Sequence, residues 1–252
     1  MSVFDASAGY ELAFSYRDVP AEVDALLAWH GGAVRTSLEL AAGPGDHALE
    51  LARRGIATAT LDLSPAMCAR VAERAAAEGL TLTRVVRADM TDFAVDETFD
   101  LVFCLIDSLA HVLTLESLIG HLRSVRRTLA PGGTYVIESL HPADGFQPGS
   151  RTDTEWTTER DGISAHIRWG RGDEPIDPLT QVTHLLVTLD VAGPGGATHH
   201  EELMAQRFWT VDELTAAARI AGLEVTERYG DFAGNPLDHP HAWRLISVLR
   251  AA

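Results

Sequence analysis

Gly43, Gly45 and Ala48 stand at the spacing of a G-x-G-x-x-A turn, and two acidic residues, Glu39 and Asp62, flank that turn. Glycine lets a backbone approach a ligand closely, because no side chain stands in the way. An acid at the end of the following strand can accept hydrogen bonds from ribose hydroxyls. These residues predict a site for a nucleoside-containing ligand, although a strand-to-helix turn that binds nothing has the same pattern.

Three further side chains could move a proton at the same edge of the fold. His141 follows a predicted strand over residues 134–140, and Asp107 and His111 follow another over residues 99–104. Histidine titrates near neutrality, so it could take a proton from a hydroxyl or ammonium group of a second substrate. The alternative is that these side chains are structural and held by hydrogen bonds. The spacing of the remaining histidines indicates no metal site.

Strands and helices alternate through the first half of the chain, which is the arrangement that must position these residues. Five short apolar runs predict strands; they cover residues 36–40, 56–61, 82–87, 99–104 and 134–140. Helical spacing predicts a short helix after the glycine turn and longer ones over 65–79 and 115–129. Such alternation favours a parallel sheet that is covered by helices on both faces.

The pattern changes after Pro142. Residues 145–153 are predicted to form a loop, and three runs with two-residue alternation predict an antiparallel patch that is inserted after the fifth strand. These runs cover residues 163–169, 182–191 and 201–209. A helix then begins at Thr210, with Glu213 at capping-box spacing, and a closing strand pair follows at residues 223–229 and 243–249.

Composition excludes several classes of function. The formal net charge is −16 and all 20 basic side chains other than histidine are arginine, so a nucleic-acid partner is disfavoured and lysine chemistry is excluded. No apolar run is long enough for a membrane span. The N-terminus lacks the pattern of a signal peptide, so a cytoplasmic protein is expected. Cys68 and Cys104 are expected to be buried and unpaired.

Five motifs, in order, resemble those of the class I S-adenosylmethionine-dependent methyltransferases. They are LELAAGPG at 38–45, LDLSPAM at 61–67, DM at 89–90, FDLVFCLID at 99–107 and LAPGG at 129–133. The resemblance covers residues 35–140 well and the C-terminal helix and strands more loosely. One departure is Ala41, which stands where the family turn usually has its first glycine.

The resemblance implies a Rossmann-like fold. It consists of a seven-stranded, mostly parallel sheet with an antiparallel C-terminal strand, helices on both faces, and the inserted antiparallel patch. One domain of 252 residues is expected. Its parts would be an N-terminal helical lid (1–34), a cofactor-binding core (35–141), the inserted strands (142–209) and the closing helix and strand pair (210–252).

The resemblance also implies S-adenosyl-L-methionine as cofactor and S-adenosyl-L-homocysteine as its product. Asp62 would hold the ribose hydroxyls, and Met67 and Met90 would lie near the adenine. The full set of expected cofactor-binding residues is Glu39, Ala41, Gly43, Gly45, Asp62, Leu63, Met67, Asp89, Met90 and Leu105. No metal is expected.

The acceptor side is less defined. Tyr10, Phe14 and Tyr16 form an aromatic group ahead of an amphipathic helix at residues 20–29, which either packs on the sheet or, as the resemblance implies, belongs to a lid over the cofactor. Two of these residues, Tyr10 and Tyr16, are expected substrate contacts. Trp169 and Arg207 in the inserted strands could line the acceptor pocket or simply pack or pair.

These features together predict an N- or O-methyltransferase of a small metabolite, such as an amino sugar, an amine or a natural-product intermediate. The alternative enzyme is a nicotinamide-dependent oxidoreductase that uses the same glycine turn. A non-catalytic alternative is a cofactor-binding scaffold that uses the inserted sheet as an interface, for example in a homodimer.

Overall fold

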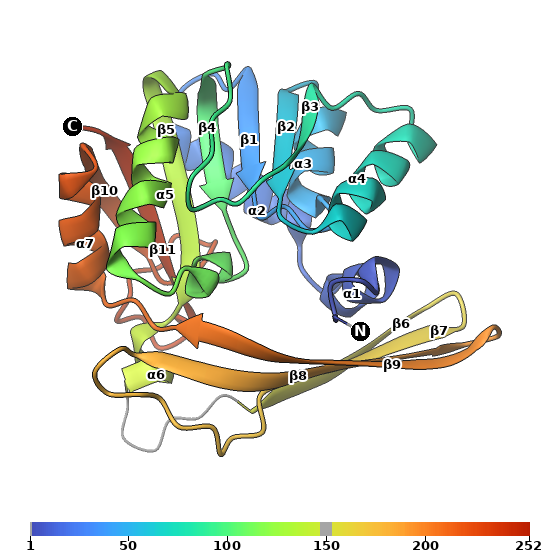
Figure 1. Ribbon diagram of the computed structural model, residues 1–252. Helices are drawn as coiled ribbons and strands as arrows, with labels where there is room; N and C mark the ends of the chain where they lie inside the picture. The colour runs from blue at the N-terminus through green and yellow to red at the C-terminus, as the bar shows by residue number, and fades with distance from the viewer. Residues whose placement is uncertain (1, 147–152) are drawn as a thin grey trace.

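The computed structural model describes residues 2–146 and 153–252, which form two β-sheets with helices around one of them (Figure 1). Within these ranges seven strands make up the larger sheet, which we call the main sheet, in the order β10-β11-β5-β4-β1-β2-β3. Their bounds are β1 (Thr36–Leu40), β2 (Ala57–Asp62), β3 (Arg84–Arg87), β4 (Phe99–Cys104), β5 (Leu129–Leu140), β10 (Leu223–Tyr229) and β11 (Arg244–Ala251). β11 pairs antiparallel with β10 and β5, and every other pair of neighbours in this sheet is parallel, so the predicted Rossmann-like sheet is confirmed.

Helices cover both faces of the main sheet, as predicted (Figure 1). The helices are α1 (Ser7–Phe14), α2 (Val19–His30), α3 (Asp46–Arg53), α4 (Pro65–Ala77), α5 (Leu115–Thr128), α6 (Pro142–Phe146) and α7 (Val211–Ile220). On one face, α3 packs against α2 through Leu51 and against α4 through Leu49. On the other face, Leu122 of α5 and Leu214 of α7 belong to one apolar cluster.

Local sequence signals account for where several helices begin. The Ser64 hydroxyl accepts a hydrogen bond from the Met67 N–H, 3.3 Å away, and Pro65 follows at the first position of α4. The predicted capping box of α7 is confirmed: Thr210 accepts from the Glu213 N–H, and the Glu213 carboxylate accepts from the Thr210 N–H.

The inserted strands form a separate antiparallel sheet, which we call the second sheet, in the order β6-β7-β8-β9. Its strands are β6 (Thr154–Arg160), β7 (Ile163–Trp169), β8 (Val182–Gly193) and β9 (Gly196–Arg207). The sequence predicted three strands and missed β6, because most of its side chains are exposed and it lacks apolar alternation. The predicted bounds of the last strand were also wrong: it begins earlier than predicted and ends at Arg207. The predicted loop lies mostly outside the described residues, and its first residue, Gly145, belongs to α6.

α1 lies between the two sheets, beside the carboxyl ends of the main-sheet strands (Figure 1). Leu12 and Phe14 of α1 pack into an apolar cluster with Ile167 of β7 and other second-sheet residues. Gly9 allows this close approach, because a Cβ there would collide with the Val191 side chain of β8. The N-terminal segment and the second sheet therefore pack together as one wall that faces the main sheet.

Two sequence-based expectations about chemistry outside the site can be compared directly with the structure. Cys68 and Cys104 are both free; Cys104 is buried, whereas Cys68 is only half-buried. In the described part of the chain no helix is long and apolar enough to cross a membrane.

A buried hydrogen-bond chain joins α5 to the main sheet. The Tyr135 hydroxyl lies 2.6 Å from His121 Nε2, and His121 Nδ1 lies 2.9 Å from the Met90 carbonyl oxygen. The carbonyl can only accept, so Nδ1 carries the proton and Nε2 accepts from Tyr135. Burial lowers the pKa of His121 to about 4, so the ring is neutral near neutral pH.

Acidification is expected to destabilise the fold through His121. Its folded-state pKa of about 4 lies below the ordinary 6.5, so stability is complete above pH 6.5 and is lost as the pH falls. From about pH 7.5 to about pH 5, the free energy of unfolding of the wild type should fall by about 2 kcal/mol more than that of His121→Leu. Urea titrations at both pH values measure this; equal falls in the two proteins would contradict a neutral buried ring.

Candidate active site

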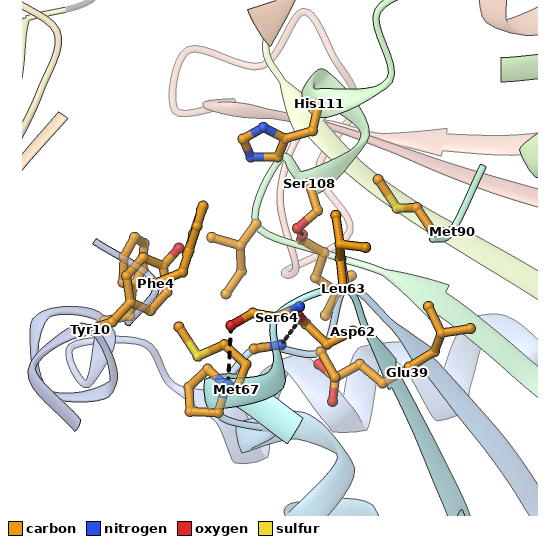
Figure 2. Close-up of a pocket in the computed structure, with 18 of the residues that line it drawn as sticks. Phe4, Tyr10, Glu39, Asp62, Leu63, Ser64, Met67, Met90, Ser108 and His111 are labelled. Atoms are coloured by element: carbon orange, nitrogen blue, oxygen red, sulfur yellow. Dashed lines mark hydrogen bonds between the residues drawn. The ribbon is translucent and has the colours of Figure 1, made fainter. Parts of the chain in front are cut away.

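A cavity of about 500 Å³ lies between the carboxyl ends of the main-sheet strands and the wall made by the N-terminal segment and β7 (Figure 2). This size is typical of a site for a small molecule. Nine of the ten expected cofactor-binding residues line it: Glu39, Ala41, Gly43, Asp62, Leu63, Met67, Asp89, Met90 and Leu105. Tyr10, Trp169 and His111 line it too.

The glycine turn between β1 and α3 needs left-handed backbone at three positions. Gly43 has φ +53° and Gly45 has φ +78°, which glycine adopts without strain. A Cβ on Gly45 would also collide with the Val71 side chain, so Gly45 serves the packing of α3 on α4 and does not line the cavity. Ala41 has φ +50°, so the residue that replaces the usual glycine is held in a conformation that costs about 1–2 kcal/mol.

The Asp62 carboxylate closes the turn from the neighbouring strand. One oxygen accepts a hydrogen bond from the Gly43 N–H at 2.7 Å, and the other accepts from the Ser64 N–H at 2.8 Å. Burial raises the pKa of Asp62, and these backbone hydrogen bonds oppose that rise. The carboxylate is therefore fixed in one orientation at the cavity wall.

Glu39 lies at the end of β1 and is almost fully buried. Its carboxylate accepts from the Ala48 N–H at 2.9 Å and lies 3.6 Å from His47 Nδ1. His47 Nε2 lies 2.6 Å from a carboxylate oxygen of Glu22 in α2. Burial alone would lower the pKa of His47, but Glu22 and Glu39 raise it to about 9. Burial raises the pKa of Glu39, and His47 opposes that rise.

Glu22 also belongs to a second group of buried, paired charges, which surrounds Arg17 and Glu138. Arg17 contacts Glu22 at 3.0 Å and makes a bidentate pair with Glu138 of β5, with distances of 3.0 and 2.9 Å. Glu138 also pairs with Arg244 of β11 at 3.0 Å and accepts from the Ile106 N–H at 2.8 Å. Burial would raise the pKa of Glu138, but the two guanidinium groups lower it. We call the connected residues Glu39, His47, Glu22, Arg17, Glu138 and Arg244 the buried charge chain.

Two apolar walls face each other across the cavity. Leu63, which is 64% exposed, lies with Met67, Met90 and Leu105 on the side of the main sheet. The N-terminal segment and β7 supply the opposite side, which we call the aromatic wall and which consists of Phe4, Tyr10, Phe14 and Trp169. Figure 2 shows Phe4 and Tyr10 across the cavity from Met90 and Glu39.

His111 stands at the end of the short 3-10 helix η1 (Ser108–His111), which follows β4. Its ring is accessible from the cavity and lies edge-on to Phe4, with 6.2 Å between ring centroids (Figure 2). The backbone of Ala205 in β9 forms a hydrogen bond with the ring. Desolvation lowers the pKa of His111 below its ordinary value, which favours the neutral imidazole.

Four other expected site residues do not line the main cavity. Asp107, His141 and Arg207 line a separate cavity of about 20 Å³. His141 is engaged at both ring nitrogens: Nδ1 accepts from the Ala143 N–H at the start of α6, and Nε2 contacts the Leu237 carbonyl oxygen. Burial raises the pKa of Asp107 to about 7.

The other two of these residues, Arg207 and Tyr16, contact side chains outside the main cavity. The Arg207 guanidinium stacks on the Trp209 ring and pairs with Glu213 at 3.0 Å. Tyr16 is 53% exposed and contacts the rings of Phe14 and Trp156 outside the cavity.

Sequence reasoning missed several cavity residues. Phe4 and Asp5 line the cavity, but they lie ahead of α1 in a stretch without periodicity, so no sequence signal marks them. His47 had a usable signal, because it follows the glycine turn in the first turn of the next helix. In the described residues no cluster of three or more histidine, cysteine or acidic side chains could hold a metal ion.

His47→Gln is expected to lower the free energy of unfolding by about 3–5 kcal/mol at neutral pH, because two buried carboxylates lose their shared cation. The folded-state pKa of about 9 exceeds the ordinary 6.5, so this stabilisation is complete below pH 6.5 and is lost as the pH rises through 9. The difference from wild type should therefore shrink at alkaline pH in urea titrations.

The matched control is His199→Gln, since His199 pairs with Asp190 on the surface and should leave stability nearly unchanged. A difference between wild type and His47→Gln that stays constant across this pH range would show that His47 carries no stabilising charge.

Comparison with known proteins agrees with this geometry. Residues 38–133 match the family model described as "Methyltransferase domain". The dTDP-4-amino-2,3,4,6-tetradeoxy-D-glucose N,N-dimethyltransferase of Saccharopolyspora spinosa is 31% identical over 192 residues, which cover 74% of this chain and 70% of that protein. The cypemycin N-terminal methyltransferase of a Streptomyces species is 30% identical over 212 residues, which cover 80% of this chain and 78% of the relative.

The fold matches as well. An S-adenosylmethionine-dependent methyltransferase from Clostridium acetobutylicum superimposes with a TM-score of 0.80 at 15% identity, covering 98% of this chain and 97% of that one. The comparisons support neither the nicotinamide-dependent alternative nor a non-catalytic scaffold. Motif order, sheet topology and sequence similarity agree, and the chain belongs to the class I S-adenosylmethionine-dependent methyltransferases.

Proposed function

We propose that this methyltransferase acts on the nitrogen of a small-molecule amine, with His111 as the catalytic residue that accepts the amine's proton. The observation that carries the proposal is the position of the His111 ring at the wall of the main cavity, opposite the motif residues. Two relatives named above support nitrogen as the acceptor atom, because both are named for methylation of an amine.

The residues present fit the cofactor. Gly43 lines the cavity with φ +53°, so the wall is open where a side chain would otherwise project. Glu39 and the turn would hold the amino-acid tail, Asp62 the ribose hydroxyls, and Leu63 with Met67 and Met90 the adenine. When bound, S-adenosylmethionine supplies a methyl group on a sulfonium, which is a strong electrophile.

The protein's own task is to align the acceptor nitrogen and to release its lone pair. An alkylamine is mostly protonated near neutral pH and cannot attack in that form. A neutral imidazole can take that proton, and the hydrogen bond with Ala205 fixes the ring that does so. A hydroxyl acceptor would be far harder to deprotonate with histidine, which favours the amine.

The N-terminal segment would act as a lid. Phe4 and Tyr10 close one side of the cavity, and the segment is anchored behind them by the Arg17–Glu138 pair. Excluding water from the reacting atoms favours methyl transfer to the acceptor over side reactions. The homodimer and the cytoplasmic location stay predictions.

Asp62→Ala is expected to weaken binding of S-adenosylmethionine by about 10- to 100-fold, because a carboxylate that would accept ribose hydrogen bonds is removed. Calorimetry with the purified protein measures this. Asp92→Ala is the control, since Asp92 is 92% exposed and lies outside the cavity lining. Equal affinity in both variants would contradict the proposed ribose contact.

His111→Gln is expected to lower kcat by about 100-fold or more at neutral pH while leaving cofactor affinity unchanged. At alkaline pH the amine loses its proton to solvent, so the variant should regain activity and the ratio to wild type should narrow. Rates from pH 6 to pH 10, measured as formation of S-adenosylhomocysteine, decide this. His184→Gln, an exposed histidine of β8, is the control. A loss of activity independent of pH would assign His111 a purely structural role.

A further inference from the structure

We propose that the acceptor amine is carried on an uncharged, largely apolar body, and not on a nucleoside diphosphate or another phosphate-bearing carrier. This inference rests on the proposed N-methylation and concerns the part of the cavity that the cofactor motifs leave free. Two observations support it. The aromatic wall lies beside carboxylates, and the arginines around it already pair with acidic side chains.

The charges that line the cavity are acidic. Five carboxylate side chains belong to the lining. Glu39, Asp62 and Asp89 lie in the cofactor motifs and Asp46 pairs with Arg74, whereas Asp5 lies on the acceptor side. Among the described residues that line it there is no arginine, and the sequence has no lysine. A diphosphate brought into this field would be repelled, and like charges placed together at a binding site cost several kcal/mol.

Three arginines beside α1 are engaged with acidic partners. Arg70 pairs with Glu11 of α1 at 2.8 Å, and Arg74 pairs with Asp46 at 2.7 Å. Arg160 of β6 lies 3.9 Å from Glu11. A phosphate group is usually held by the planar fork of an arginine, and binding one here would require breaking an existing pair.

The helix N-termini on the cofactor side of the cavity offer no phosphate site either. At the start of α3, the Ala48 N–H donates to the Glu39 carboxylate at 2.9 Å. At the start of α4, the Met67 N–H donates to the Ser64 hydroxyl. These are the backbone groups that commonly bind phosphate in α/β folds, and here side chains of the protein already occupy them.

The acceptor side offers instead what an ammonium group on an apolar body needs. Phe4, Tyr10 and Phe14 form a continuous surface, with ring centroids 5.5 and 4.6 Å apart. Asp5 lines the cavity beside these rings and accepts a hydrogen bond from the Ser2 N–H. The Ser2 hydroxyl donates to Glu202, which lies outside the cavity lining. Aromatic faces and carboxylates both attract a cationic amine, and the rings also bury apolar surface.

A matched pair of acceptors tests the inference. The same amino sugar is supplied as an alkyl glycoside and as its thymidine diphosphate ester, together with a short apolar peptide that has a free N-terminal amine. Formation of S-adenosylhomocysteine gives kcat/KM for each. We expect the uncharged carriers to be preferred by about 100-fold or more, the factor that corresponds to about 3 kcal/mol of repulsion.

A binding measurement and a charge reversal complete the test. Thymidine diphosphate alone, titrated in the presence of S-adenosylhomocysteine, should show no binding at millimolar concentration. Asp5→Arg should raise kcat/KM for the diphosphate ester and lower it for the uncharged amine, whereas Asp92→Arg, outside the cavity lining, should change neither.

The outcomes separate the two proposals. Preferred turnover of the diphosphate ester, or tight binding of thymidine diphosphate, would overturn the carrier inference and leave N-methylation standing. Cofactor binding without transfer to any amine would overturn the proposed function, and the inference with it.

Discussion

The buried charge chain is the interaction on which the rest of the structure depends. Removing six charged side chains from water is unfavourable unless each keeps its partners, and here every member has at least one contact within 3.6 Å. Arg17 is central, because it neutralises Glu22 and Glu138 at once. Any displacement of the N-terminal segment would leave those two carboxylates buried without it, so the segment and the main sheet are bound into one unit.

The buried charge chain also positions both ends of the cavity. Through Glu39 it reaches the glycine turn, and through Glu138 it holds the Ile106 N–H in the loop after β4. That loop is strained, since Ile106 and Asp107 have φ +55° and +57°, and a second hydrogen bond, from the Leu140 N–H to Asp107, fixes it. η1 starts directly after this loop, so the place of His111 depends on Glu138 and Asp107, neither of which lines the main cavity.

Local signals explain what could be predicted from the sequence. Glycines at positive φ, acids at strand ends and a capping box each depend on a few neighbouring residues. The predictions of the turn, of the edge of the sheet and of α7 were therefore correct. β6 was missed because its exposed side chains give no alternation. His141 follows β5 as predicted, but this position says nothing of the helix start that engages its ring or of the separate cavity that it lines. Arg17 and Glu138 are 121 residues apart, and no local pattern joins them.

The cavity is assembled from two separate parts of the chain. The side that fits the cofactor comes from residues within the matched segment 38–133, whereas the aromatic wall comes from residues before and after it. If the aromatic wall contacts the acceptor as proposed, substitutions there would alter which acceptor binds while the cofactor contacts stay intact. An architecture of this kind lets new acceptor specificities evolve in small steps, each of them starting from a working enzyme.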